Sequence, residues 1–558
     1  MLKKILLFLM VSLTVLSADD YAYSREWLNL LYYEKSILGY KSPAMEDGFF
    51  VTAQGRTDPQ AEYAESLRLV LENDRQFKTK FPLRYKYIAR YNNLKYEPVV
   101  QANTDVKRVF LAYPSRYMRN SASMFGHLFL LLETDSGILD SQILHFVGDS
   151  GDSTGFDFAW KGLTGKFEGR FIQEPYYTKI QEYNFLESRE ILFYTIKLSP
   201  EQIENLQLHY LEMQNTFFWY YYINKNCAFF IGRFLDVVLD SDVIDVPLYL
   251  IPAQATEKFR EADLLADERL VPSITKVFDQ WYSDLNLVQK GQVQATLFYP
   301  EDNSAIIQDE ELFSIVEYML RSNKESANLL SESDLYDQLQ QFHLPEMWLY
   351  LPATENIKKL YTQSAGLWGS TEYNWGGFFN LVHFSDYEQF NELEINTIRL
   401  GGLSVEKLAD RTLRYDLDLA EINNILQFNM IFPTWSWSAR SMFSYHENWS
   451  TNQEAYTGHA FNLRNWGLLY GMIGINYANY DTLGKRELDR LDLFSGLKLG
   501  WRRNITKNLK LRVAYEHKYN TDYQSAELIY KYYDLLGKLT CLNSHDDTIY
   551  QIGLECLF

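Results

Sequence analysis

The sequence predicts an α+β chain of several domains that ends in an antiparallel β-barrel of roughly 8–12 strands. Its 558 residues are enough for about three or four domains with cores of their own. Helical and strand-like patterns mix over residues 96–255, whereas short alternating segments follow one another over residues 363–558. The chain ends on such a segment, with phenylalanine as its last residue.

The composition is that of a folded protein and excludes some classes of function. Hydrophobic residues make up 47% and charged residues 23%, which excludes extensive disorder and collagen-like repeats. The net charge of −20 disfavours nucleic acid as a partner, because phosphate backbones require clusters of Lys and Arg. Aromatic residues reach 16%, as expected for large cores or for a belt at a membrane interface. The 3 cysteines are too few for a disulfide scaffold.

Residues 1–18 have the features of a Sec-type signal peptide. Lys3 and Lys4 form a positive start, and the apolar run Ile5–Leu16 is too short to span a bilayer. Small residues suited to cleavage follow, ending at Ala18. We therefore exclude this segment from the fold, with an uncleaved anchor as the alternative.

Two regions are expected to be mainly helical. Residues 19–95 begin with apolar side chains around Trp27. Residues 256–362 are strongly charged, and Glu257–Arg269 and Asp309–Asn323 carry apolar residues at helical spacing. No linker rich in Pro, Gly or Ser separates the regions, so we expect them to pack against their neighbours.

Residues 363–558 are predicted to form the barrel. The last segment alternates and places one set of apolar side chains on a single face: Tyr550, Ile552, Leu554, Cys556 and Phe558. A terminal phenylalanine on such a strand resembles the closing strand of bacterial outer-membrane barrels. With the signal peptide, it predicts an outer-membrane protein; a soluble all-β domain is the alternative.

Further strands and turns are expected upstream in this region. The strand-like segments are Asn391–Leu400, Thr434–Tyr445, Leu468–Tyr477, Leu491–Trp501, Leu509–Tyr515 and Glu527–Tyr533. Polar turns are expected at Asn448–Glu454, Asp481–Arg486 and Asn504–Asn508. Cys541 and Cys556 fall among them, either as wall residues or as a disulfide, and we assign them no chemistry.

Two histidines stand out in residues 96–255. His127 precedes the segment Leu128–Leu132, which is apolar on both faces like a buried strand. If Asp135–Gly137 is a three-residue hairpin loop, His127 and His145 lie directly opposite each other, with Cβ atoms about 5 Å apart. The structural alternative is that both are hydrogen-bonded core residues.

Cys227 is predicted to lie in the first turn of a helix. Apolar residues recur at helical spacing after it, and Asn226 is a good N-cap. The positive end of the helix dipole favours the thiolate form of a cysteine at this position. A lone cysteine is otherwise most often a small buried hydrophobe.

The predicted arrangement has the members of a papain-type triad: a thiol at a helix start, a histidine on a strand and a second histidine. Cys227 is then the nucleophile, His127 the base and His145 the residue that orients it. Backbone N–H groups near Cys227 are candidates for an oxyanion hole. Because His127 precedes Cys227 in sequence, the arrangement is permuted relative to papain. One cysteine and two histidines without tight spacing do not predict a metal site, and no cofactor is expected.

These motifs together resemble the Lnb N-terminal periplasmic domain family over about Val106–Val238. The resemblance rests on Ser121 and Ser123 before Phe125-Gly126-His127, then Gly162–Gly169, Glu187–Glu190 and Asn226-Cys227. It implies a permuted NlpC-like papain fold, similar to that of lecithin-retinol acyltransferase. It also implies that His127 and Cys227 are a catalytic pair, supported by Ser121, Ser123, Gly126 and Asn226. The third position in this family is often Asn, where this sequence has His145.

The family's namesake is implicated in moving an acyl chain from a phospholipid to the α-amine of a lipoprotein. The resemblance therefore implies an outer-membrane-anchored periplasmic thiol acyltransferase or hydrolase with phospholipid and lipoprotein as substrates. A peptidoglycan amidase or endopeptidase with the same dyad is a second hypothesis. The third is a non-catalytic barrel protein or porin with a periplasmic binding module.

Overall fold

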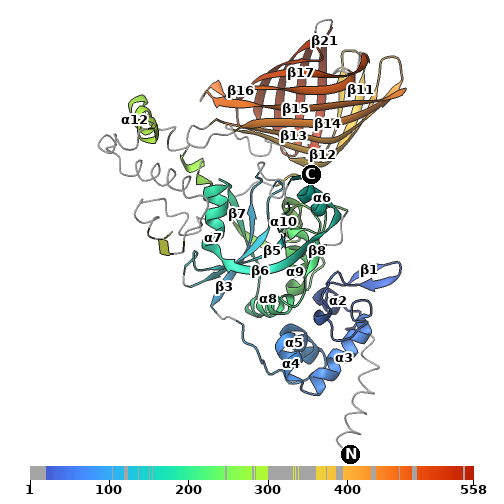
Figure 1. The fold of residues 1–558 in the computed structure, drawn as a ribbon, viewed down its shortest axis with the longest axis vertical. Coiled ribbons are helices and arrows are strands. Elements are labelled where there is room, and N and C mark those ends of the chain that lie inside the picture. The colour runs from blue at the N-terminus through green and yellow to red at the C-terminus, as the bar shows by residue number, and fades with distance from the viewer. Residues whose placement is uncertain are drawn as a thin grey trace, which may run out of the picture. The chain divides into compact units, whose positions relative to one another are not determined.

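The computed structural model describes residues 21–298 and 360–558, apart from short gaps, and a few positions between 331 and 337. The longest gaps are 118–123, 385–393, 429–434 and 481–486. The chain forms two compact units, Met1–Ile357 and Lys358–Phe558 (Figure 1). The signal peptide expected at residues 1–18 lies outside the described residues.

The first unit begins with a small helical part. Its elements are α2 (Arg25–Leu30), the hairpin of β1 (Glu34–Ser36) and β2 (Gly39–Lys41), η1 (Asp47–Phe49), α3 (Pro59–Leu71), α4 (Arg75–Lys80) and α5 (Pro82–Tyr91). Asp58 and Asp74 cap α3 and α4, and Pro59 and Pro82 stand at helix starts. The described residues thus confirm the expected helical character of this region.

A buried charge cluster joins this helical part to the domain that follows. The Arg84 guanidinium lies 3.3 Å from Glu62 and 3.2 Å from Glu212, and all three side chains are fully buried. Removing one member would leave a buried charge without its partner, which is strongly destabilising. The helical part is therefore attached to the domain by more than its apolar contacts.

The following domain is built on an antiparallel sheet of seven strands in the described residues, in the order β8-β6-β5-β4-β3-β7-β9. The strands are β3 (Val106–Pro114), β4 (Phe129–Thr134), β5 (Gln142–Asp149), β6 (Phe167–Pro175), β7 (Ile191–Ile196), β8 (Phe218–Tyr220) and β9 (Leu265–Val271). The helices are α6 (Gly155–Thr164), α7 (Tyr176–Ile180), η2 (Gln181–Leu186), α8 (Pro200–Met213), α9 (Cys227–Leu239), α10 (Pro252–Glu261) and α12 (Leu287–Phe298). The nearly all-buried helix α9 packs against β4 and β5.

None of the helices in the described part of the chain is long and apolar enough to cross a membrane.

The helix expected over Glu257–Arg269 is wrong in its second half. Helix α10 ends at Glu261, and Asp263 adopts a positive φ of 57° that turns the chain into β9. Strand β9 then pairs with β7 at the edge of the sheet. The spacing of apolar residues in this short charged segment could not predict the pairing, because the pairing depends on β7, which is distant in sequence. The helix expected over Asp309–Asn323 lies outside the described residues.

The second unit is a closed antiparallel barrel of twelve strands, β10 to β21 in chain order. They are β10 (Ser364–Ser370), β11 (Trp375–Phe384), β12 (Glu394–Lys407), β13 (Leu413–Leu426), β14 (Ser436–His446), β15 (Asn448–Asn462), β16 (Leu468–Tyr480), β17 (Glu487–Asn504), β18 (Leu509–Lys518), β19 (Thr521–Tyr532), β20 (Leu535–Ser544) and β21 (Asp547–Leu557). Strands β10 and β21 pair from Ser364↔Leu557 to Ser370↔Gln551 and close the barrel. The backbone of Phe558 adds hydrogen bonds to Thr362 and Gln363.

The turn expected at Asn448–Glu454 is wrong, and the one at Asn504–Asn508 is confirmed. Strands β14 and β15 join through Glu447 alone, at a φ of 60°, and Trp449 already pairs with Tyr445. The polar run is a strand because its alternate side chains face the polar interior of the barrel. The turn expected at Asp481–Arg486 lies outside the described residues.

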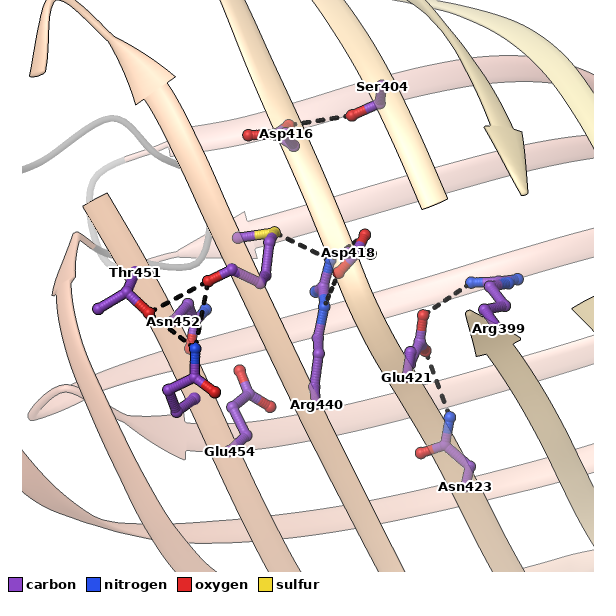
Figure 2. Close-up of polar contacts among 12 residues, drawn as sticks. Arg399, Ser404, Asp416, Asp418, Glu421, Asn423, Arg440, Thr451, Asn452 and Glu454 are labelled. Atoms are coloured by element: carbon purple, nitrogen blue, oxygen red, sulfur yellow. Dashed lines mark hydrogen bonds and ion pairs between the residues drawn. The ribbon is translucent and has the colours of Figure 1, made fainter. Parts of the chain in front are cut away.

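The barrel has an apolar outer wall and a charged interior. Leu367, Ile473, Leu493, Leu539, Ile552 and Leu554 are among the exposed apolar residues of the wall. Inside, Arg440 pairs with Asp418 at 2.9 Å and Arg399 with Glu421 at 3.0 Å, from neighbouring strands (Figure 2). Apolar residues outside and charges inside are the reverse of a soluble barrel and fit a lipid environment.

Candidate functional site

Cys227 is the first residue of α9, and Asn226 caps the helix as predicted. Asn226 Oδ1 accepts hydrogen bonds from the N–H groups of Ala228 and Phe229 at 3.0 and 3.3 Å. Asn226 Nδ2 donates to the carbonyls of Leu250 and Tyr222 at 2.6 and 3.0 Å. Asn226 therefore fixes the helix start between two loops, and this also fixes the position of the thiol.

The Cys227 thiol is buried and has several hydrogen-bond partners. The N–H groups of Leu128, Ala228 and Cys227 and the Tyr220 hydroxyl hydrogen-bond with the sulfur. The Cys227 N–H also donates to the Tyr220 hydroxyl. Burial raises the pKa of the thiol, and these hydrogen bonds lower it by less than burial raises it. The resting group is thus the neutral thiol, because desolvation outweighs the helix dipole that favours the thiolate.

His127 lies directly before Leu128 and follows a glycine that the backbone requires. Gly126 has a φ of +90°, and a Cβ there would lie 2.5 Å from the Tyr113 ring and 2.9 Å from the Pro114 carbonyl oxygen. Burial lowers the pKa of His127 well below its ordinary value, with smaller effects from His145, Lys179 and Arg189. Its Nε2 is buried and has no hydrogen-bond partner among the described residues.

His145 lies beside His127, but the predicted register is wrong by two residues. Phe129, and not His127, pairs with His145, and the β4–β5 loop is longer than Asp135–Gly137. Because strand side chains alternate, a shift of two keeps both histidines on one face. Their ring centroids are 6.0 Å apart and the rings are perpendicular. The two histidines therefore lie side by side, in a diagonal position and not directly opposite each other.

A carboxylate that the sequence analysis missed holds His145. Glu174 Oε1 of β6 lies 2.8 Å from His145 Nε2 and 3.2 Å from the Lys179 ammonium. Burial raises the pKa of Glu174, but His145 and Lys179 outweigh this and hold it at about 2. Glu174 is therefore ionised and lies against the buried His145 ring. Predicting this contact from the sequence would require the register of β5 with β6. No local pattern gives that register, because α6 lies between the two strands in the chain.

Tyr183 forms another wall of the site. It belongs to the π-helix η2, and its ring lies 6.3 Å from that of His127. The buried Arg189 guanidinium lies 4.6 Å above the Tyr183 ring and donates to the carbonyls of Pro114 and Ser115. Single π-helical turns are frequent at functional sites, because they displace one side chain from the regular spacing.

Two predicted supporting serines and two further cysteines complete the residues singled out from the sequence. Ser121 and Ser123 lie outside the described residues, so their supporting role stays a prediction. Cys541 and Cys556 are free thiols of the barrel strands β20 and β21. In the described part of the chain, no group of three or more His, Cys, Asp or Glu side chains is arranged to hold a metal ion.

Fold and site together define an outer-membrane-type barrel protein whose other unit carries two neighbouring histidines and a buried cysteine bound to the N–H of Leu128, the residue after His127. Residues 95–253 match the model of the Lnb N-terminal periplasmic domain. Residues 20–91 match the model of a domain of unknown function, DUF7843. A search of curated proteins found no match. The chain is thus an outer-membrane protein with a periplasmic domain of the Lnb type.

The barrel is similar to solved outer-membrane proteins at low identity. The KdgM porin is 13% identical, with a TM-score of 0.24 over 35% of this chain and 99% of that chain. The outer membrane protein Omp33 of Acinetobacter baumannii is 10% identical, with a TM-score of 0.24 over 37% and 100%. The NanC porin is 9% identical, with a TM-score of 0.23 over 35% and 98%. None of these indicates what this chain binds.

Proposed function

We propose that the periplasmic unit is a Cys-His thiol acyltransferase or hydrolase that acts on acyl groups of phospholipid or lipoprotein through a thioester. The observation that carries the proposal is the position of the Cys227 thiol. It is bound to the Leu128 N–H, directly beside His127, whose Nε2 has no partner in the described residues. Thiol acyl transfer needs a nucleophile and a histidine that can take its proton, and the sulfur is bound to the N–H of the residue that directly follows His127.

In the first half-reaction, Cys227 Sγ attacks the ester carbonyl carbon while its proton passes to His127 Nε2. The carbon–oxygen bond to the alcohol breaks, and the alcohol leaves with the proton from His127. In the second half-reaction, an amine or water attacks the thioester carbon, gives its proton to His127, and the thiol leaves with that proton. His145, held by Glu174, orients His127.

Hydrogen-bond donors lie around the Cys227 thiol, where an oxyanion would form beside the sulfur. The Phe229 N–H is bound to Asn226, whereas the Ala228 N–H is shared between Asn226 and the thiol. The N–H groups of Cys227 and Leu128 and the Tyr220 hydroxyl lie at the thiol as well. We assign the oxyanion to these three donors, with Tyr220 as the side chain that sequence reasoning missed.

The proposal is tested by comparing the N-terminal lipopeptides of host lipoproteins, by mass spectrometry, between wild type and Cys227→Ala. We expect the variant to lack one acyl chain, and Cys541→Ala, a barrel thiol, to match wild type. Muropeptides from the same cells are measured in parallel. Unchanged lipopeptides with altered muropeptides would contradict the proposal and favour the amidase. No change in either would favour the non-catalytic barrel protein.

A further inference from the structure

The β1–β2 hairpin ends in two fully exposed aliphatic side chains. Ile37 and Leu38 at its tip are as exposed as in an extended peptide, with relative accessibilities of 105% and 99%. The turn is fixed, because Ser36 Oγ accepts from the Leu38 N–H at 3.2 Å and donates to the Gly39 carbonyl at 3.0 Å. Gly39 adopts a φ of +108°. The exposure is therefore built into an ordered turn that projects from the helical part (Figure 1).

Behind the tip, the hairpin carries the side chains of a membrane interface. Lys35 and Lys41 are exposed on the two strands. The Tyr40 ring lies 5.6 Å from that of Tyr23, which is 45% exposed. Aromatic rings favour the headgroup level of a bilayer, and lysines there are attracted to anionic lipids. The hairpin thus runs from apolar tip to aromatic and cationic base, in the order of depth in a bilayer.

The base of the hairpin is joined to the loop that carries the thiol. Glu34 forms an ion pair of 2.7 Å with Lys225, two residues before Cys227. This contact connects a segment of the domain of unknown function to the start of α9. The base of the hairpin is therefore in contact with a residue close to the candidate nucleophile.

We propose that this hairpin inserts its Ile37–Leu38 tip into the headgroup region of an anionic phospholipid bilayer. Two aliphatic side chains are too small an area for a protein interface, which buries about 800 Å² per partner. They suffice for a bilayer to which the barrel already tethers the same chain, because tethering raises the effective concentration of lipid. The two lysines complement the lipid's negative charge. The inference goes beyond the proposed function and does not depend on the chemistry of Cys227.

The test measures the depth of the tip in protein reconstituted into vesicles of phosphatidylethanolamine and phosphatidylglycerol. Leu38→Cys is made in full-length protein with Cys227, Cys541 and Cys556 replaced by serine, and is labelled with an environment-sensitive fluorophore. Nitroxide-labelled lipids then quench the fluorophore according to depth. The matched control is Glu201→Cys on α8, an exposed position whose side chain is 60% accessible. We expect severalfold stronger quenching at position 38 than at position 201.

Two further variants make the outcome specific to lipid. Ile37→Ser should weaken partitioning of the tip about tenfold, because one aliphatic side chain leaves the bilayer. Lys35→Glu with Lys41→Glu should abolish the preference for phosphatidylglycerol over neutral vesicles. Equal quenching at positions 38 and 201 would overturn the proposal. So would quenching that requires added host protein, because it would make the partner a protein. No readout uses Cys227, so these outcomes are independent of the proposed activity.

Discussion

Burial acts on Cys227 and His127 in opposite directions and leaves both neutral at pH 7. It raises the pKa of the thiol and lowers the pKa of the imidazole. We therefore predict that the rate of Cys227 alkylation rises with pH to a midpoint above the value of about 8.5 for a free cysteine. Mass-spectrometric quantification of iodoacetamide adducts measures this midpoint, with Cys541 in the same protein as reference. A midpoint below pH 7 would contradict it and indicate a thiolate–imidazolium pair.

The Tyr220 hydroxyl contacts both the sulfur and the N–H of Cys227. If it stabilises the oxyanion, Tyr220→Phe should lower kcat for acyl transfer about a hundredfold. It should also raise the alkylation midpoint of Cys227, because a hydrogen bond that lowers the thiol pKa is lost. Tyr222→Phe is the matched control, since its hydroxyl is buried without a hydrogen-bond partner in the described residues. Equal kcat in the two variants would show that Tyr220 contributes only packing and does not stabilise the oxyanion.

At the scale of the element, helix α9 depends on one side chain for its start. Asn226→Ala removes the cap and leaves the carbonyls of Leu250 and Tyr222 without their donor. We expect a loss of about 2 kcal/mol in the free energy of unfolding, measured by urea titration of the full-length protein in detergent. Ser199→Ala, at the more exposed cap of α8, should cost about 1 kcal/mol. An equal cost at both caps would show that the buried carbonyls find other donors.

The sequence predicted residue types and faces better than pairings. Helix α9, its cap and the buried strand after His127 were predictable, because spacing and capping are local signals. The register that pairs His145 with Phe129 was not predictable. The loop between β4 and β5 is longer than the three-residue hairpin loop expected at Asp135–Gly137. Glu174 and Tyr220 reach the site through strand pairings across α6 and α8, which no local pattern encodes.

At the scale of the molecule, the charged interior of the barrel joins strands that are distant in sequence. Glu454 of β15 pairs with Lys498 of β17 and Lys518 of β18, each at 2.9 Å. We predict heat-modifiable mobility in SDS gels for the wild type, and conversion at a lower temperature for Glu454→Gln. Glu527→Gln is the control, because Glu527 lies 3.6 Å from Arg512 in a more exposed pair. A wild-type chain without heat-modifiable mobility would contradict the barrel itself.

The closure of the barrel by β10 and β21 also sets an order of events during biogenesis. The free edge of β10 stays unpaired until β21, at the far end of the sequence, reaches it. The periplasmic domain at residues 95–253 is translated and exported well before that strand. Its sheet can fold while the barrel strands are still being delivered. A chain that stops before β21 would therefore carry a complete periplasmic domain but an open sheet edge, which periplasmic chaperones and proteases can distinguish from the finished barrel.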